Sequence, residues 1–179
     1  MIAVLMGVSG SGKTTIGVLL ARRMGVVFAD ADDYHTAANK AKMAAGHALE
    51  DADREPWLRE LNGLMRGWMK AGMGGVLACS ALKESYRETL GEGMPAGAVR
   101  FVLLEASKEL IAKRLAARHH EFMTPKLLDS QLATLERPVG DSVCVENDGT
   151  PEEVVGKVLV GLGEGELETG RNLDGTSAV

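Results

Sequence analysis

The sequence predicts an α/β fold in which a five-stranded parallel sheet is covered by helices on both faces. Short apolar runs alternate with helix-patterned segments along all but the end of the 179 residues, and the first run, 2–6, carries no charge. Strands that alternate with helices pair in parallel through crossover connections. An uncharged run of this length is typical of a strand buried on both faces.

Each predicted strand is a run of four to six mostly apolar residues next to a turn or a polar residue. The strands are expected at 2–6, 26–29, 75–79, 99–104 and 142–145. The intervals show helical patterning or helix-favouring composition, and the third helix places Trp57, Leu61 and Trp68 on one apolar face. The helices are expected at 13–24, 36–45, 56–73, 82–90, 108–118, 126–135 and 151–162.

Two helix starts carry explicit capping signals. Ser107 precedes the helix at 108–118 and is its expected N-cap. Thr150 and Pro151 open the last helix, and Glu153 completes a capping box. The chain is therefore expected to form one domain over 1–162, followed by a Gly- and Glu-rich tail at 163–179 that we expect to be mobile.

Composition excludes several functional classes. The chain is 45% hydrophobic and 25% charged, as in soluble globular proteins. Its net charge of −5 leaves no basic field for nucleic acid. The longest uncharged stretches, 1–12 and 71–82, are too short to span a membrane, and no secretory signal is expected. We expect a cytoplasmic protein without nucleic-acid or membrane partners, and both cysteines, Cys79 and Cys144, buried and reduced.

Residues 7–14, GVSGSGKT, match the phosphate-binding pattern G-x-x-x-x-G-K-[ST] between the first strand and the first helix. Glycines let the backbone approach phosphate oxygens, and the helix N-terminus supplies positive charge. Lys13 would reach the β- and γ-phosphates, and the Thr14 hydroxyl would bind Mg²⁺. The pattern predicts ATP and Mg²⁺ as cofactors, with nucleotide contacts from Gly7, Ser9, Gly10, Ser11, Gly12, Lys13, Thr14 and Thr15.

Two carboxylates narrow the reaction. Asp30 and Asp32 stand two residues apart at the end of the second strand, and strand alternation would place both on one side. Open α/β sheets bind their ligands at this edge. Asp30 could support the metal while Asp32 takes a proton from an attacking hydroxyl. The third strand ends without the Asp-Glu pair typical of large ATPases, and no GTPase guanine motif is present.

A set of polar residues follows that would suit a small anionic acceptor. At 100° per residue, His35, Asn39 and Lys42 share one helix stripe. Arg54 could hold a carboxylate through two parallel hydrogen bonds, and Lys83 and Arg87 share a face after the third strand. The predicted substrate-binding residues are Asp32, His35, Asn39, Lys42, Arg54, Lys83 and Arg87.

Together these blocks resemble the gluconate kinase family of small-molecule P-loop kinases. The resemblance covers roughly 1–162 and includes DADDYH at 30–35, DADREPWL at 51–58, CSALK at 79–83 and LLDSQL at 127–132. It implies a three-layer sandwich, ATP- and Mg²⁺-dependent phosphorylation of D-gluconate at its 6-hydroxyl, and a homodimer. In such kinases the segment corresponding to 119–125 is a short lid. Arg118 beside it is then expected to meet the transferring phosphoryl group.

Two other functions stay open at this point. One is another small-molecule kinase of the same architecture, acting on shikimate or a nucleoside monophosphate. The other is a nucleotide-dependent switch with slow hydrolysis and a protein partner. The chain also departs from the resembled pattern, with Ala31 where glycine is common and Glu121 near a common histidine position.

Overall fold

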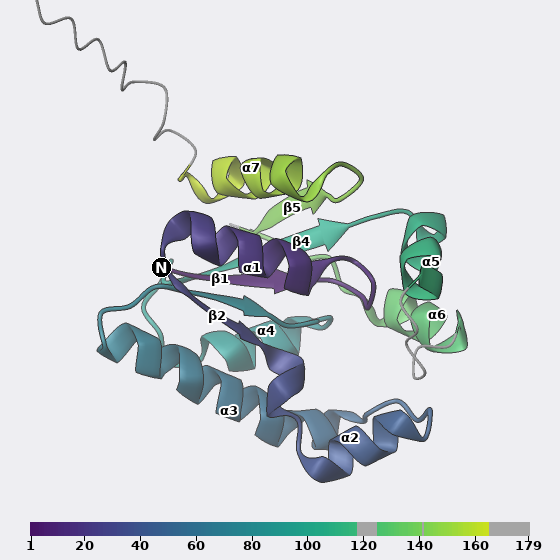
Figure 1. Ribbon diagram of the computed structural model, residues 1–179. Helices are drawn as coiled ribbons and strands as arrows, with labels where there is room; N and C mark the ends of the chain where they lie inside the picture. Colours follow the sequence, from purple (N-terminus) through teal and green to yellow (C-terminus); the bar gives the residue numbers. More distant parts are fainter. Residues whose placement is uncertain (118–124, 141, 165–179) are drawn as a thin grey trace, which may run out of the picture.

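The computed structural model describes residues 1–117, 125–140 and 142–164, and it confirms the five-stranded parallel sheet (Figure 1). The strand order is β2-β3-β1-β4-β5, with every neighbouring pair parallel. The strands are β1 (Ile2–Met6), β2 (Val27–Asp30), β3 (Gly75–Ala78), β4 (Val99–Glu105) and β5 (Val143–Glu146). The central strand β1 therefore delivers the phosphate-binding loop to the middle of one edge.

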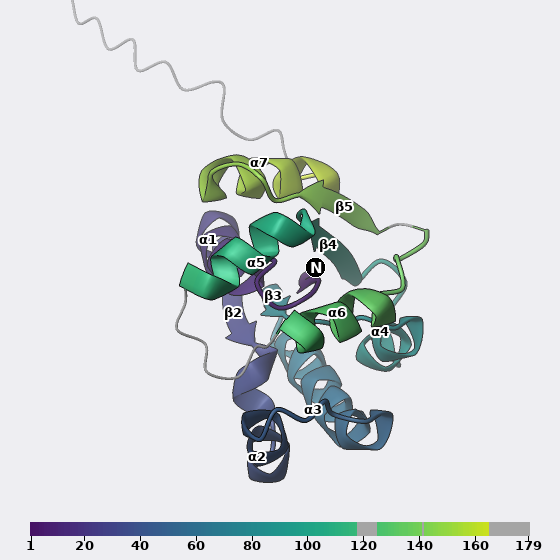
Figure 2. The ribbon, with the colours of Figure 1, turned by 90° about the vertical axis from the view of Figure 1, so that its right-hand side faces the viewer.

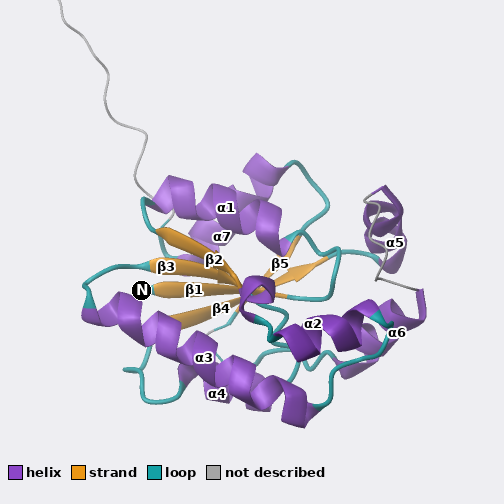
Figure 3. Ribbon diagram, turned by 60° about the horizontal axis from the view of Figure 1, so that its bottom comes forward, coloured by secondary structure: helices purple, strands orange, loops and turns teal. Residues whose placement is uncertain are grey.

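The helices lie in two layers and one end group. They are α1 (Lys13–Met24), α2 (Ala37–Ala44), α3 (Asp51–Lys70), α4 (Glu84–Gly91), α5 (Lys108–Ala117), α6 (Pro125–Thr134) and α7 (Pro151–Leu162). Helices α1 and α7 cover one face of the sheet, and α3 and α4 cover the other (Figure 3). Helices α2, α5 and α6 lie beyond the carboxyl ends of the strands, and Figure 2 looks onto this end.

Strand β1 shows why the sheet needs both layers. All five of its side chains are fully buried. Ile2, Val4 and Met6 belong to the core under α3, whereas Ala3 and Leu5 belong to the core under α1 and α7. The uncharged run thus divides its side chains between two cores, as period-two alternation requires.

Helix α3 begins earlier than predicted. Its first residue is Asp51 rather than Pro56, because the Glu50 N–H donates to the Asp53 carboxylate at 2.7 Å and starts the helix there. Pro56 consequently lies in the second turn, where it lacks the N–H that would reach the carbonyl of Ala52. The predicted start treated this proline as a first-turn residue and missed the acidic start signal.

Most other element boundaries agree with the predictions within two residues. The Ser107 hydroxyl accepts from Leu110 N at 3.1 Å, and Thr150 and Glu153 form the capping box, so both predicted helix starts are confirmed. The expectation for Cys144 is wrong, because this thiol is exposed on β5, an edge strand that has one neighbour; Cys79 is buried as expected. In the described part of the chain, no helix is long and apolar enough to cross a membrane.

Candidate active site

The loop after β1 has the geometry of an anion site. The N-cap residue of α1 is Gly12, which has a positive φ of 94°. Because glycine has no side chain, the N-cap residue cannot cap the first N–H groups of the helix with a side-chain hydrogen bond. The first turn of α1 contains no acidic residue. The Lys13 ammonium lies over the loop and donates to the carbonyls of Gly7 (3.0 Å) and Val8 (3.1 Å). Helix dipole and lysine together favour phosphate here.

Two residues that the sequence analysis did not select hold this loop in place. Gln131 on α6 accepts from the Ser9 N–H at 2.7 Å, and Asn147, just after β5, donates to the Ser11 carbonyl at 2.6 Å. Gln131 stood in a block quoted for the resemblance. Asn147 follows a strand at its carboxyl end, the same signal that selected Asp30.

The second predicted group, Asp30 and Asp32, meets the loop directly. The Thr14 hydroxyl donates to the Asp30 carboxylate at 2.7 Å. The predicted strand alternation of the two acids is wrong, because Asp32 lies in a 3₁₀ turn over Ala31–Tyr34. The other Asp30 oxygen accepts from the Asp32 N–H at 3.1 Å and caps that turn. A capped turn, not a continuing strand, therefore brings the two carboxylates together.

The core positions this turn through Trp57. Its indole N–H donates to the carbonyl of Ala31 at 2.8 Å, and the Ala31 methyl group is fully buried. Alanine thus fits where the resembled pattern has glycine, since Ala31 does not have a positive φ. His35 stacks on the Trp57 ring at 4.3 Å between centroids. His35 precedes α2 instead of sharing its stripe, which corrects the predicted three-residue helix face.

The electrostatics of the turn suit a proton acceptor. The pKa of Asp32 is raised, first because the surrounding protein reduces the hydration of its carboxylate and second because Asp30 carries the same charge. Its side chain still exposes 87% of its surface, so solvent screens both effects. Burial lowers the pKa of His35, so its ring is neutral at pH 7. The His35 contact to Asp32 at 3.8 Å is therefore not a salt bridge at that pH.

The donor set beside the loop fits Mg²⁺. Thr14 and Asp30 offer hard oxygen atoms, which this ion prefers. No cluster of three or more acidic, histidine or cysteine side chains suited to a metal occurs among the residues described. Magnesium usually takes only one or two protein carboxylates and fills its other positions with water and substrate phosphates.

On the far side of the turn, two predicted residues converge on α3. Asn39 is buried and donates to the Asp53 carbonyl at 2.9 Å, and Lys42 donates to the Asp53 carboxylate at 2.6 Å. The bond from Lys42 lowers the pKa of Asp53, and the same bond raises the pKa of Lys42. These contacts fix α2 on the start of α3.

The two cations Lys83 and Arg54 lie beside Asp51. Lys83 donates to both of its oxygens at 2.9 and 2.8 Å, and the Tyr86 hydroxyl donates to it as well. Arg54 lies 3.8 Å from the same carboxylate and bonds the Leu49 carbonyl at 2.6 Å. Hydrogen bonds from Lys83 and Tyr86 lower the pKa of Asp51. The structure thus gathers two predicted substrate cations around one protein carboxylate.

Arg87 fits its predicted substrate role least well. Its guanidinium is almost fully buried, pairs with Glu84, and donates to the Ala81 carbonyl at 3.0 Å. Ala81 has a positive φ of 42°, a strained backbone for a residue with a side chain. Arg87 therefore supports the loop that carries Lys83. Arg118 and most of the predicted lid lie outside the described residues, between α5 and α6.

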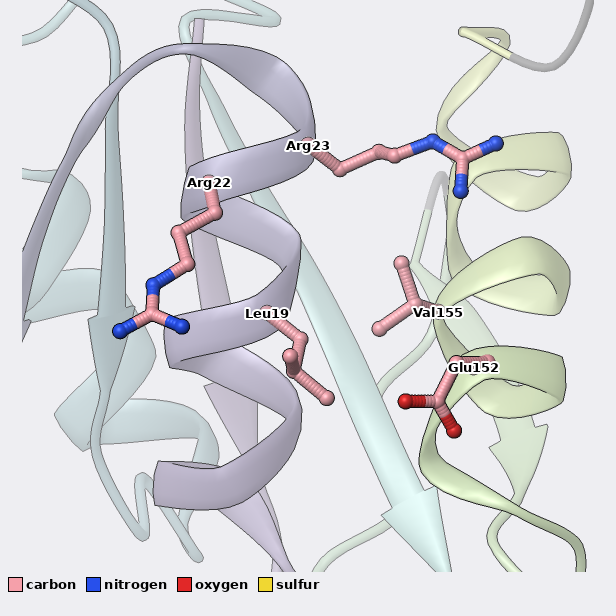
Figure 4. A pocket seen from close by; sticks show the side chains of 5 residues that line it. All are labelled: Leu19, Arg22, Arg23, Glu152 and Val155. Carbon is pink, nitrogen blue, oxygen red and sulfur yellow. The ribbon is translucent and has the colours of Figure 1, made fainter.

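A shallow surface pocket lies between α1 and α7, away from all of these groups (Figure 4). Its walls come from Leu19, Arg22, Arg23, Glu152 and Val155. None of these residues belongs to the predicted site. The site is instead the edge where the loop after β1, the turn after β2 and the start of α3 meet.

Comparison with known proteins identifies the family of this chain. A family model described as an AAA domain matches residues 2–138. A gluconokinase of Gluconobacter oxydans is 48% identical over 147 residues, covering 82% of this chain and 81% of that protein. A gluconokinase structure from Sinorhizobium meliloti superposes with a TM-score of 0.81 at 39% identity over 90% of both chains. Shikimate kinase of Aquifex aeolicus (TM-score 0.55, 19% identity, 91% of this chain and 96% of that one) shares the fold. On these similarities, the chain belongs to the gluconokinase family of P-loop kinases.

Proposed function

We propose that this chain transfers the γ-phosphoryl group of ATP to the 6-hydroxyl of D-gluconate, giving 6-phospho-D-gluconate and ADP. The observation that carries the proposal is the 2.7 Å contact from Thr14 to Asp30. It joins the phosphate loop to the Asp32 turn, so phosphoryl donor and proton acceptor share one site. The family relatives, 40–48% identical in several organisms, carry the gluconokinase name.

In this mechanism the 6-hydroxyl oxygen attacks the γ-phosphorus, and the bond from that phosphorus to the ADP oxygen breaks. Asp32 accepts the hydroxyl proton, a role that its raised pKa favours. Lys13 and the N–H groups of the loop stabilise the charge on the phosphate oxygens. Thr14 and Asp30 would hold Mg²⁺, which supplies further charge neutralisation when bound.

The acceptor would lie between the Asp32 turn and two cations, Arg54 on α3 and Lys83 after β3. Arg54 and Lys83 are the proposed partners of the gluconate carboxylate, because both already surround the carboxylate of Asp51. His35, at the end of the Asp32 turn, and Asn39 and Lys42 on α2 would serve the hydroxyl groups. Arg87 would contribute by supporting the Lys83 loop, and Arg118 stays a predicted contact of the phosphoryl group.

The remaining assignments extend the family relationship. We propose that residues 1–162 form a single kinase domain, that the enzyme acts in the cytoplasm, and that it forms a homodimer. A shikimate kinase is less favoured, since the Aquifex aeolicus enzyme shares only the fold at 19% identity. A nucleoside monophosphate kinase remains the other alternative, which the acceptor panel below tests.

An acceptor panel tests the proposal. ADP release would be measured with D-gluconate, shikimate, nucleoside monophosphates and no acceptor, and the phosphorylated position would be read by ³¹P and ¹³C NMR. We expect ADP release to require gluconate and the phosphoryl group to lie on the oxygen of carbon 6. Equal ADP release without any acceptor would instead point to a nucleotide switch.

A further inference from the structure

Asn147 is a buried polar residue at the carboxyl end of β5 to which the proposed mechanism gives no task. Only 4% of its surface is exposed, and each of its polar groups has a partner. Its backbone N–H donates to the Glu105 carbonyl at 2.7 Å, which ties it to β4. Its side-chain amide donates to the Ser11 carbonyl at 2.6 Å, across 136 positions of sequence.

The orientation of this amide is fixed from both ends. One guanidinium nitrogen of Arg114 on α5 donates to the Asn147 backbone carbonyl at 2.8 Å and to its side-chain oxygen at 3.4 Å. Arginine can only donate hydrogen bonds, and the Ser11 carbonyl can only accept them. A flipped amide would therefore lose both side-chain contacts.

Gly12 lets the amide approach this closely. A Cβ atom at Gly12 would lie 2.4 Å from the Asn147 amide nitrogen, so no other residue fits the position. In a trans peptide the C=O and N–H groups point in opposite directions. When Asn147 holds the Ser11 carbonyl, it also fixes the Gly12 N–H in the opposite direction, within the same peptide plane. N–H groups of such loops form the phosphate cradle.

Helix α5 is part of the same arrangement. A Cβ at Gly10 would lie 2.9 Å from the Leu115 side chain, so α5 packs directly against the loop. The other guanidinium nitrogen of Arg114 is buried and has no hydrogen-bond partner within the described ranges. Asn147 thereby anchors a partly buried cation on the helix that packs against the loop.

We propose that Asn147 is a positioning residue for phosphoryl transfer: it locks the Ser11–Gly12 peptide so that the loop presents its N–H groups to the nucleotide phosphates. This inference rests on the proposed function only in requiring that the loop bind ATP. It concerns the phosphates alone and predicts no effect on the acceptor.

The test replaces the amide donor without changing its size. In Asn147→Asp a carboxylate oxygen faces the Ser11 carbonyl, so the bond is lost and two acceptors oppose each other. Binding of ADP and of inorganic tripolyphosphate would be measured by calorimetry, and the gluconate KM at saturating ATP. We expect both phosphate ligands to bind about 10- to 100-fold more weakly, as for loss of one buried hydrogen bond. The gluconate KM should change less than about threefold.

Asn62→Asp is the matched control. The Asn62 amide also donates to backbone carbonyls, those of Leu90 (2.9 Å) and Glu92 (3.0 Å), but these bonds join the middle of α3 to the end of α4. The Asn62→Asp variant should have a lower melting temperature than the wild type and an unchanged ADP affinity. Asn147→Ser, which is too short to reach Ser11, repeats the measurement if the aspartate variant does not fold.

Three results would overturn the proposal. Unchanged ADP affinity in a folded Asn147 variant would show that the loop keeps its shape alone. Equal weakening of ADP and gluconate would indicate general damage to the fold. Weaker ADP binding with unchanged tripolyphosphate binding would place the effect at the nucleoside and not at the phosphates. Failure of the wild type to phosphorylate gluconate would affect the proposed function and leave this comparison intact.

Discussion

The nucleotide side and the acceptor side of this site are built by different means. The loop after β1 is held by two hydrogen bonds between its backbone and neutral amides: Gln131 accepts from it and Asn147 donates to it. A lysine from its own motif also donates to its carbonyls. The acceptor side consists of ion pairs at partly exposed side chains, Lys42 with Asp53 and Lys83 with Asp51. One side is a fixed backbone shape, and the other is a set of charges that already neutralise one another.

The difference concerns what each substrate must displace. Phosphates meet N–H groups whose directions the fold has set, so little rearrangement is required. At the proposed acceptor site, a sugar-acid carboxylate would meet cations that already have Asp51 as a carboxylate partner. We therefore expect substitutions on the two sides to separate cleanly into effects on nucleotide binding and effects on the acceptor.

The largest expected effect on one side of the site alone comes from Asp32→Asn. A positioned general base contributes roughly 10²- to 10⁴-fold, so turnover with gluconate should fall by about that factor while ADP affinity is unchanged. Steady-state kinetics and calorimetry give the two numbers. Asp33→Asn, one residue along the same exposed turn, is the control and should retain activity. A normal turnover number for Asp32→Asn would remove the proton acceptor from the mechanism.

Comparing the wild type with Asp32→Asn at different pH values tests the direction of the pKa shift. Because the pKa of Asp32 is raised, kcat/KM of the wild type should fall on acidification at a pH above the ordinary aspartate value of roughly 3.9. A carboxyl with a raised folded-state pKa stabilises the fold when protonated and loses that contribution as pH rises through this pKa. Asp32→Asn should therefore raise the melting temperature slightly at pH 7, and the gain should vanish at low pH.

A smaller effect is expected from Arg54→Ala, which sharpens the acceptor side. A hydrogen bond to a charged group contributes roughly 1.5–3 kcal/mol, about 10- to 100-fold. The wild type should prefer gluconate to glucose, which lacks the carboxylate, and the variant should narrow that ratio. Arg59→Ala on the same helix, where Arg59 pairs with Glu55 at 3.0 Å in solvent, should leave the ratio unchanged. If Arg54→Ala keeps the wild-type ratio, Lys83 is the next cation to test.

Trp57→Phe probes the support under the Asp32 turn. It keeps an aromatic ring but removes the donor to the buried Ala31 carbonyl, at a cost of about 1–3 kcal/mol of stability. Gluconate kcat/KM should fall several-fold with ADP affinity unchanged. Trp68→Phe makes the same change at the other end of α3 in the same core. Kinetics that are alike in the two variants would contradict a positioning role for the indole N–H.

The smallest expected effect is deletion of 165–179. Helix α7 already ends with Gly163 in the left-handed region, where its N–H and that of Glu164 bond the last carbonyls. Melting temperature and turnover should both match the full chain. A chain ending at residue 158, which loses the buried Leu162, should melt lower. A large loss for the first deletion would show that the domain extends past 162.

The sequence predicted the parts of the molecule that depend on local rules. The strand 2–6, the loop 7–14 and the cap at Thr150 follow from composition and spacing within a few residues, and all three agree with the structure. The Asp30–Asp32 geometry was predicted for the wrong reason, because a 3₁₀ turn held by Trp57 is a long-range effect. Ion pairs such as Lys83 with Asp51 depend on tertiary packing, which spacing does not encode.

The residues missed by the sequence analysis share one property. Gln131 and Asn147 act on the loop from 122 and 136 positions away, and both are amides without charge. Motif reasoning selects charged or nucleophilic side chains, so a neutral amide attracts attention only when its partner is known. Arg87 is the opposite case, a charged residue selected by location whose side chain pairs with Glu84 and donates to the Ala81 carbonyl, so its substrate role stays a prediction.

The placement of β1 at the centre of the sheet also has a consequence for how the chain is made. This strand is synthesised before both of its partners, which begin only at Gly75 and Val99. At about 5–20 residues per second, synthesis from Met6 to Gly75 takes roughly 3–14 s. During that interval the five apolar residues of β1 have no neighbouring strand to pair with. Nascent chains of this enzyme should therefore depend on chaperone protection more than the finished fold does.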